Sequence, residues 1–107
     1  MAISPTQRTL KRLRDSGDYP LVTIVERWNA FAKIRQDLFG IIDILAIDSK
    51  GNTVGLQVTS YSNISARVKK ITDSPSTPSL RSADWVLLVE GWHKKDNKWV
   101  SRIVDVS

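Results

Sequence analysis

Asp43 is the residue that most clearly indicates chemistry, because it is the one charged group in an otherwise apolar run, residues 39–47. A run that is apolar on both alternating faces is typical of a central strand covered on both sides. Burying a carboxylate in such a place is costly unless it is paired or binds a cation. Acidic groups in such surroundings concentrate at functional sites. We therefore interpret Asp43 as the centre of a candidate active site.

Two further polar residues are expected beside Asp43. The turn signal at residues 48–52 is followed by a second β-rich run, residues 53–60. If that turn closes an antiparallel hairpin, counting back in steps of two places Gln57 opposite Asp43, about 4.5–5.5 Å away at Cβ. Thr59 shares the face of Gln57, because alternate residues of a strand point the same way. The sequence thus predicts a polar cluster on one side of an apolar hairpin.

This cluster offers the oxygen ligands that a hard divalent cation prefers. Mg²⁺ keeps several waters and needs only one or two carboxylates together with amide or carbonyl oxygens. The candidate ligands are the Asp43 carboxylate, the Gln57 side-chain oxygen and the Val58 carbonyl. We expect Mg²⁺, or Mn²⁺ in its place.

Residues 37–60 resemble the core hairpin of the PD-(D/E)XK nuclease superfamily, particularly its Holliday-junction-resolvase-like and VRR-NUC-like phage and bacterial members. Gly40 and Asp43 match the Gly-x-x-Asp step of that family, which implies that Asp43 is the metal-binding aspartate. Gln57 and Thr59 stand where the family usually has Glu-x-Lys. The resemblance implies a metal-dependent DNA endonuclease in which Asp43, Gln57 and Thr59 line the catalytic site.

Thr59 cannot supply the ammonium group expected of the family's lysine. In this superfamily the following helix sometimes supplies the missing cation, which nominates Arg67, Lys69 or Lys70. We favour Arg67 as the catalytic cation, because it flanks the apolar stripe of that helix, whereas Lys69 lies nearly opposite the stripe.

A second carboxylate is also needed, because Thr6 stands in the first helix where many relatives carry an acidic residue. Asp37 is one candidate metal ligand, although it could equally begin a strand or pair with Arg35. Glu26 is the other, although a surface ion pair beside Arg27 is the interpretation that we favour for it.

The elements that must position these residues form an α/β pattern. The order α-β-β-β-α-β-β predicts a single α/β domain over residues 1–107, with a mixed central sheet flanked by helices. The resemblance described above implies that this domain is restriction-endonuclease-like. The helices are expected at residues 5–16 and 62–71, the strands at 21–28, 39–47, 53–60, 85–90 and 98–104, and a loop at 72–78. Residues 29–36 are compatible with irregular structure or a short helical turn.

The net charge of +5 favours a polyanionic partner, which we take to be DNA. The expected DNA-binding residues lie on the two helices: Arg8, Lys11, Arg12, Lys69 and Lys70. The absence of cysteine and the presence of only one histidine exclude disulfides, thiolate zinc sites and serine- or cysteine-type triads.

Four tryptophans are spread over three strands or strand ends. We expect Trp85 and Trp99 in the core and Trp92 at the surface. No apolar run approaches the ~20 residues of a membrane span, and no secretory signal is visible, so a cytoplasmic protein without membrane contact is expected.

Three functions are compatible with these features. The first is a Mg²⁺-dependent DNA endonuclease, acting on branched or otherwise structured DNA. The second is a DNA-binding or assembly module that keeps the fold without the catalysis. The third is self-association of the final hairpin into a homodimer, which could coexist with the first.

Overall fold

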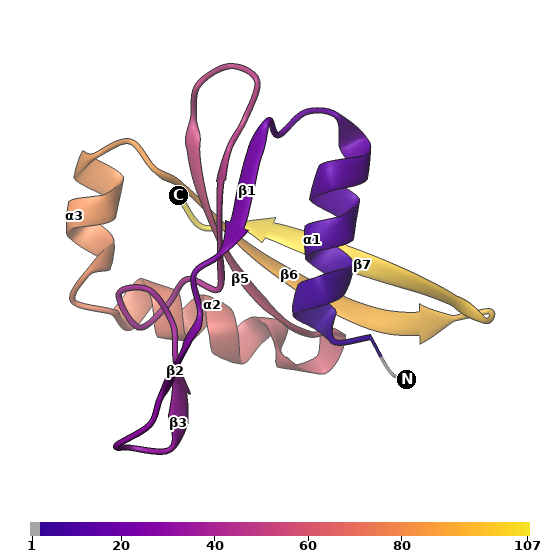
Figure 1. Cartoon of the computed structure of the whole chain (residues 1–107), viewed down its shortest axis with the longest axis horizontal. Helices are drawn as coiled ribbons and strands as arrows, with labels where there is room; N and C mark the ends of the chain where they lie inside the picture. The colour runs from indigo at the N-terminus through magenta and orange to yellow at the C-terminus, as the bar shows by residue number, and fades with distance from the viewer. Residues whose placement is uncertain (1–2) are drawn as a thin grey trace.

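The computed structural model describes residues 3–107 and is drawn in Figure 1. The helices are α1 (Pro5–Ser16), a 3-10 turn η1 (Tyr61–Asn63), α2 (Ile64–Asp73) and α3 (Thr77–Ser82). The strands are β1 (Leu21–Ile24), β2 (Arg27–Asn29), β3 (Ile34–Gln36), β4 (Ile44–Ile47), β5 (Thr53–Ser60), β6 (Val86–Lys95) and β7 (Lys98–Asp105).

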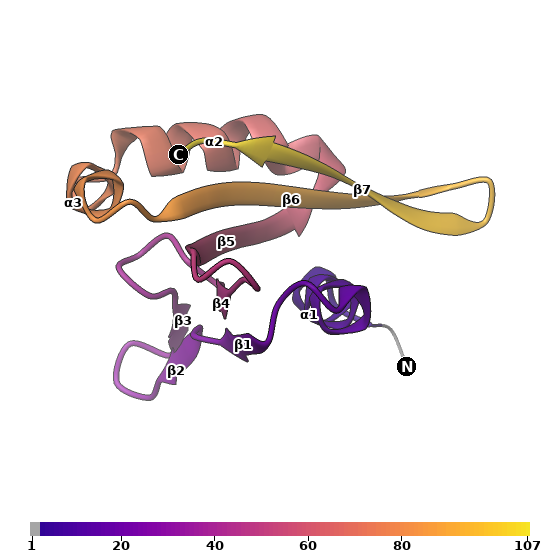
Figure 2. The ribbon, with the colours of Figure 1, turned by 90° about the horizontal axis from the view of Figure 1, so that it is seen from above.

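Five strands form the main sheet in the order β1-β4-β5-β6-β7. Only β5 and β6 run parallel, joined through α2 and α3, and the other neighbours are antiparallel. In Figure 2, α2 and α3 lie on one side of this sheet and α1 lies on the other. The predicted α/β class with a mixed sheet flanked by helices is therefore confirmed, with one more helix and one more hairpin than predicted.

Helix α1 begins and ends where its sequence predicts. The Ser4 side chain accepts a hydrogen bond from the Gln7 amide at 3.2 Å, and Gly17 ends the helix with a φ of 77°. Leu10 and Leu13 are buried and pack against the sheet. The first helix is thus fixed by its two caps and by one apolar stripe.

The β4–β5 hairpin has the predicted register, with Leu45 opposite Gly55. The Asp48 carboxylate stabilises the turn by accepting hydrogen bonds from the Lys50 and Asn52 amides at 2.9 and 2.8 Å. The prediction of one strand over residues 39–47 is wrong in its first half, where the chain turns and the strand begins only at Ile44.

Residues 21–28 form two strands rather than the single strand predicted. β1 joins the main sheet, whereas β2 pairs with β3 in a separate hairpin that also accounts for residues 29–36. Both ends of this hairpin are hydrogen-bonded to the chain just before β4. The Val25 amide donates to the Asp43 carbonyl at 2.9 Å, and Leu38 forms an isolated antiparallel β-bridge with Ile42. The β2–β3 hairpin therefore stands beside Asp43.

The second helix contains the predicted stripe, with Ile64 and Ile71 buried. The prediction of a loop over residues 72–78 is wrong at both ends, because α2 continues to Asp73 and α3 begins at Thr77. The buried Thr77 hydroxyl donates to the Ile71 carbonyl and holds the two short helices together.

The tryptophan predictions are corrected at two positions. Trp99 is 45% exposed and lies under the Arg8 guanidinium at 3.9 Å, because β7 is an edge strand that extends past the body of the protein. Trp92 is half-buried instead, and its indole N–H donates to the Thr9 hydroxyl at 2.8 Å. Trp85 packs against the core as expected.

No helix within residues 3–107 is both long enough and apolar enough to cross a membrane.

Candidate metal centre

Three carboxylates meet where the β2–β3 hairpin joins the sheet. Glu26 directly precedes β2, Asp37 directly follows β3, and Asp43 directly precedes β4. One carboxylate oxygen from each lies within 4.8 Å of the other two. The backbone contacts of Val25 with Asp43 and of Leu38 with Ile42 create this convergence, because they fix the ends of the β2–β3 hairpin against the start of β4.

Asp43 and Gln57 face each other as the turn counting predicts. The Gln57 amide nitrogen donates to Asp43 Oδ2 at 2.6 Å, and the Val58 backbone amide donates to the same oxygen at 2.8 Å. Both Asp43 and Gln57 are almost fully buried. The N–H and C=O of one strand residue point the same way, so the Val58 carbonyl faces the same edge of β5.

The pKa values of Asp43 and Asp37 shift in opposite directions. Burial raises the pKa of Asp43 to about 7, helped by its hydrogen bond to Asp37 and by the negative charges of Asp37 and Glu26. Burial also acts to raise the pKa of Asp37, but the hydrogen bond from Asp43 and the charge of Lys70 lower it below its ordinary value. The pair therefore shares a proton: Asp43 becomes neutral below about pH 7, whereas Asp37, whose pKa is lowered, keeps its charge in more acidic solution than an ordinary aspartate does.

The proton shared by Asp43 and Asp37 lies between two carboxylates, and a metal cation could replace it there. Two ionised carboxylates at this distance repel each other unless a positive charge lies between them. The Gln57 Oε1 atom is buried, and it has no hydrogen-bond partner within residues 3–107. Carboxylate and amide oxygens of this kind are the ligands of Mg²⁺ and Mn²⁺. The residues Glu26, Asp37, Asp43 and Gln57 thus fit a divalent metal.

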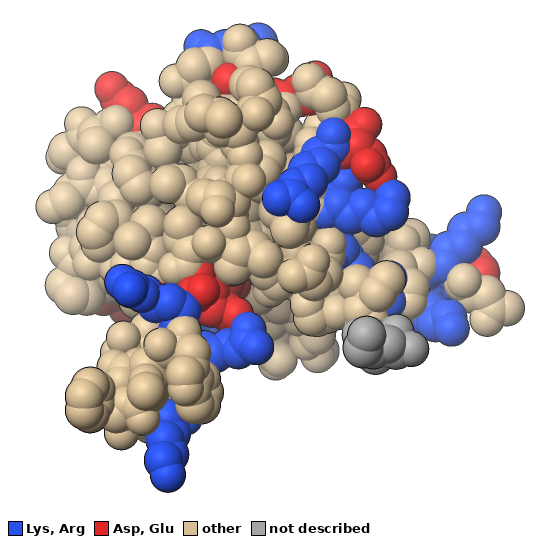
Figure 3. Space-filling model, viewed as in Figure 1, with Lys and Arg blue, Asp and Glu red and all other residues tan. Residues whose placement is uncertain are grey.

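Cations flank the acidic cluster on its open side. The Lys70 ammonium lies 3.4 Å from Asp37 Oδ2, and the Arg35 guanidinium lies 2.6 Å from Glu26 Oε1. Lys70, Arg35 and Asp37 line a cavity of about 420 Å³. In Figure 3, acidic atoms reach the surface in the crease between the β2–β3 hairpin and the body, with basic side chains on both sides. The cavity can therefore admit an anionic group next to the carboxylates.

The other residues predicted from the second helix and from β5 lie as follows. Thr59 is buried on the α2 side of the sheet, the side of Gln57. Arg67 is half-buried, and no hydrogen bond or ion pair within the described chain joins it to the acidic cluster. Lys69 points away and pairs with Asp73 at 2.6 Å. Lys70 is the cation of this helix that reaches Asp37. The sequence had named it as a DNA-binding residue and as one of three candidate catalytic cations, of which Arg67 was favoured.

The predicted DNA-binding residues of α1 lie on the opposite face of the sheet. Arg8 stacks on Trp99, and Lys11 forms an exposed ion pair with Asp15. Arg12 forms two hydrogen bonds to the fully buried Glu90, at 2.8 and 3.0 Å. This helix therefore lies away from the acidic cluster, and its Arg12 is engaged inside the protein.

The convergence of Glu26 with Asp37 is the feature that the sequence interpretation did not find, since it named them as alternatives. The β2–β3 register places Arg27 opposite Gln36, so one more step places Glu26 opposite Asp37. Recognising the β2–β3 hairpin in the sequence would have paired these two residues. The hairpin is hard to recognise because residues 29–36 lack the usual short turn sequence between two alternating runs.

Comparison with models of protein families, with curated proteins and with solved structures finds no match to this chain. What the protein does must therefore be inferred from the chemistry of its own residues.

Proposed function

We propose that this protein is a metal-dependent DNA endonuclease of the PD-(D/E)XK kind, which hydrolyses phosphodiester bonds. The observation that carries the proposal is the convergence of Glu26, Asp37 and Asp43, with the amide nitrogen of Gln57 in contact with two of them. Arg35 and Lys70 pair with Glu26 and Asp37, so within residues 3–107 Asp43 is the one buried carboxylate of the three without a cation of its own, and a metal ion would supply it.

In this proposal Asp43, Asp37 and Glu26 would hold Mg²⁺ or Mn²⁺, and the Gln57 amide oxygen would join them only if the amide group turned over. The metal would supply positive charge at the phosphate and lower the pKa of a water nucleophile. Val58 keeps Asp43 oriented through its backbone amide, at 2.8 Å. Gln57 fixes the spacing between Asp43 and Asp37, because its amide nitrogen contacts both, at 2.6 and 3.4 Å.

Lys70 takes the role of the amine that Thr59 does not provide. Its ammonium already lies 3.4 Å from Asp37, so it can contact a phosphate oxygen held in the adjoining cavity. Arg35 flanks the cavity from the hairpin and can contact a neighbouring phosphate. Two cations beside three carboxylates would suit an anionic substrate: the cations would contact its phosphates, and the carboxylates would hold the metal.

A non-catalytic DNA-binding module is the second candidate. The observation that favours it is Thr59, which is buried and uncharged at the position that carries the catalytic lysine in the family that this chain resembles. In such a module the acidic cluster would hold a structural cation, and Lys70 and Arg35 would bind the backbone without cleavage.

Nicking of a supercoiled plasmid in the presence of Mg²⁺ or Mn²⁺ tests the proposal. The parent protein should nick only with metal, and Asp43→Asn should lower the rate by more than about 100-fold, since it removes the central ligand charge. Asp15→Asn is the matched control, because Asp15 is an exposed carboxylate on the far face. Nicking that survives Asp43→Asn, or a parent that never nicks, rejects the endonuclease and leaves the binding module.

A further inference from the structure

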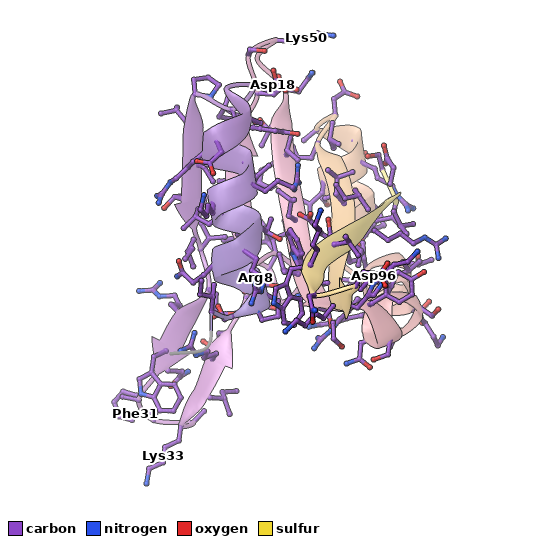
Figure 4. The ribbon with its side chains drawn as sticks, turned by 90° about the vertical axis from the view of Figure 1, so that its right-hand side faces the viewer. Arg8, Asp18, Phe31, Lys33, Lys50 and Asp96 are labelled. Atoms are coloured by element: carbon purple, nitrogen blue, oxygen red, sulfur yellow. The ribbon has the colours of Figure 1, made fainter. Side chains whose placement is uncertain are left out.

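The β2–β3 hairpin projects from the body and exposes large apolar side chains. Phe31 is 101% exposed, Trp28 is 62% exposed and Ile34 is 51% exposed. Figure 4 shows Phe31 and Lys33 at the end of the hairpin that lies farthest from the body. Aromatic side chains held so far from the core contribute little to folding, so the hairpin indicates a surface that meets a partner.

One face of the hairpin continues directly from the acidic cluster. Alternate residues of a strand share a face, so Trp28 lies on the face of Glu26 and Arg35 lies on the face of Asp37. Trp28 and Arg35 are also paired across the two strands. A molecule with one end at the carboxylates would therefore pass Arg35 and Trp28 as it leaves the cavity.

The charges of the hairpin identify the kind of partner. Arg27, Lys33 and Arg35 are exposed cations, and residues 27–36 contain no acidic residue, since Glu26 and Asp37 at the two ends of the hairpin belong to the acidic cluster. A strip of cations interleaved with exposed aromatic rings suits a nucleic-acid strand, with phosphates on the cations and bases on the rings. A second copy of this basic hairpin would place like charges together.

We propose that the β2–β3 hairpin is an arm that binds unpaired nucleotides of DNA, with Trp28 stacking on a base next to the phosphate held at the acidic cluster. Phe31 provides a second stacking surface at the tip. The inference rests on the proposed function, because it assigns the hairpin to that function's substrate. The faces of bases are open to a tryptophan ring only where the strands are separated, so the arm selects DNA with unpaired nucleotides over a closed duplex.

Binding of fluorescently labelled oligonucleotides, measured by anisotropy, tests this arm without any cleavage. The protein used is the Asp43→Asn variant, so that the result does not depend on metal or turnover. Trp28→Leu should weaken binding to a single-stranded oligonucleotide about tenfold or more, because one base loses its stacking partner. Trp28→Phe should retain most of the affinity, because the ring remains, and binding to a hairpin-closed duplex should change less than about twofold.

Two controls separate stacking from other effects. Ile34→Ala removes an exposed apolar side chain of the same hairpin that has no ring, so it should leave single-strand binding unchanged. Sedimentation of each variant reports whether the hairpin instead joins two copies of the chain. Equal binding by Trp28→Leu and the parent, equal losses for single strand and duplex, or a dimer that dissociates in Trp28→Leu with unchanged DNA affinity would each overturn the arm.

The two proposals, the DNA-binding hairpin and the endonuclease, can fail separately. A parent protein that never nicks DNA, together with selective loss of single-strand binding in Trp28→Leu, would retain the arm and reject the catalysis. Metal-dependent nicking that requires Asp43, together with unaltered binding in Trp28→Leu, would retain the catalysis and reject the arm.

Discussion

Two buried carboxylates lie on opposite faces of the same sheet, and they are treated in opposite ways. Glu90 is fully buried and receives two hydrogen bonds from Arg12, at 2.8 and 3.0 Å, and a third from Ser101, at 2.6 Å. Asp43 is nearly as buried, but its nearest charged neighbours are two further carboxylates. Within the described chain Glu90 has a cation of its own, whereas Asp43 has none, because Arg35 and Lys70 pair with Glu26 and Asp37 instead.

We interpret this difference as one between a structural carboxylate and a functional one. A buried carboxylate that already holds a guanidinium and a hydroxyl has no use for a metal, and its role is to connect α1 with β6 and β7. A carboxylate kept among like charges, with its pKa raised to about 7, costs stability and persists where a ligand offsets that cost. Substitution should therefore have opposite effects on stability at the two sites.

The largest change in stability is expected at the Glu90 site. Arg12→Met leaves the Glu90 carboxylate buried without its cation, which should lower the free energy of unfolding by about 3–5 kcal/mol. Thermal melting or urea denaturation measures this loss. Lys11→Met is the matched control, because Lys11 is an exposed neighbour whose ion pair contributes at most about 0.5 kcal/mol.

A second substitution sharpens that result. Adding Glu90→Met to Arg12→Met removes the unpaired charge, so the double variant should recover most of the lost stability. If Arg12→Met alone is harmless, Glu90 is not held by Arg12, and the contrast between the two sites fails.

Substitution at the other carboxylate should stabilise the protein, and only at high pH. The pKa of Asp43 is raised in the folded state, so its contribution to stability is fully present below pH 4 and is lost as pH rises through about 7. Asp43→Asn removes this loss, and we expect it to be about 1–2 kcal/mol more stable than the parent at pH 8 and equal to it at pH 4. Melting curves without divalent metal at both pH values check this. A destabilised Asn variant at pH 8 would mean that Asp43 is a structural partner.

The sequence alone predicted the central part of this site but not its edge. Asp43 and Gln57 follow from the register of one hairpin with a clear turn signal, which strand alternation then fixes. Glu26 and Lys70 could not be placed in the same way, because their positions depend on contacts between the β2–β3 hairpin, the start of β4 and α2. Those contacts join distant parts of the chain, and no local pattern encodes them.

The tryptophans illustrate the same limit. Apolar alternation in the last two strands predicts burial for Trp99, but burial also requires that something cover the strand at that point. The β6–β7 hairpin extends past the body, so Trp99 has only Arg8 over its ring, whereas Trp92 lies against α1. The α/β class and the broad order of elements were predictable, while α3, the β2–β3 hairpin, the ends of elements and their covering were not.

The smallest of the expected effects concerns Lys70. Lys70→Met should lower the nicking rate and the affinity for DNA about tenfold and reduce the slope of log affinity against log salt by about 1, because one phosphate contact is lost. Its effect on stability should stay within about 0.5 kcal/mol, since the side chain is partly exposed. Lys69→Met is the matched control, because Lys69 pairs with Asp73 and points away from the cluster. Equal effects of the two substitutions would leave Lys70 without a special role.

The most direct test of the metal centre is calorimetric titration of Mn²⁺ into the parent protein and into Asp43→Asn. At pH 8 the parent should bind one equivalent, and Asp43→Asn should weaken binding at least about tenfold, because the central ligand charge is lost. Lowering the pH to 5.5 should weaken binding in the parent, since Asp43 becomes protonated below about pH 7. The account is contradicted if the parent binds no Mn²⁺ at millimolar concentration, or if it binds Mn²⁺ equally with and without the Asp43 carboxylate.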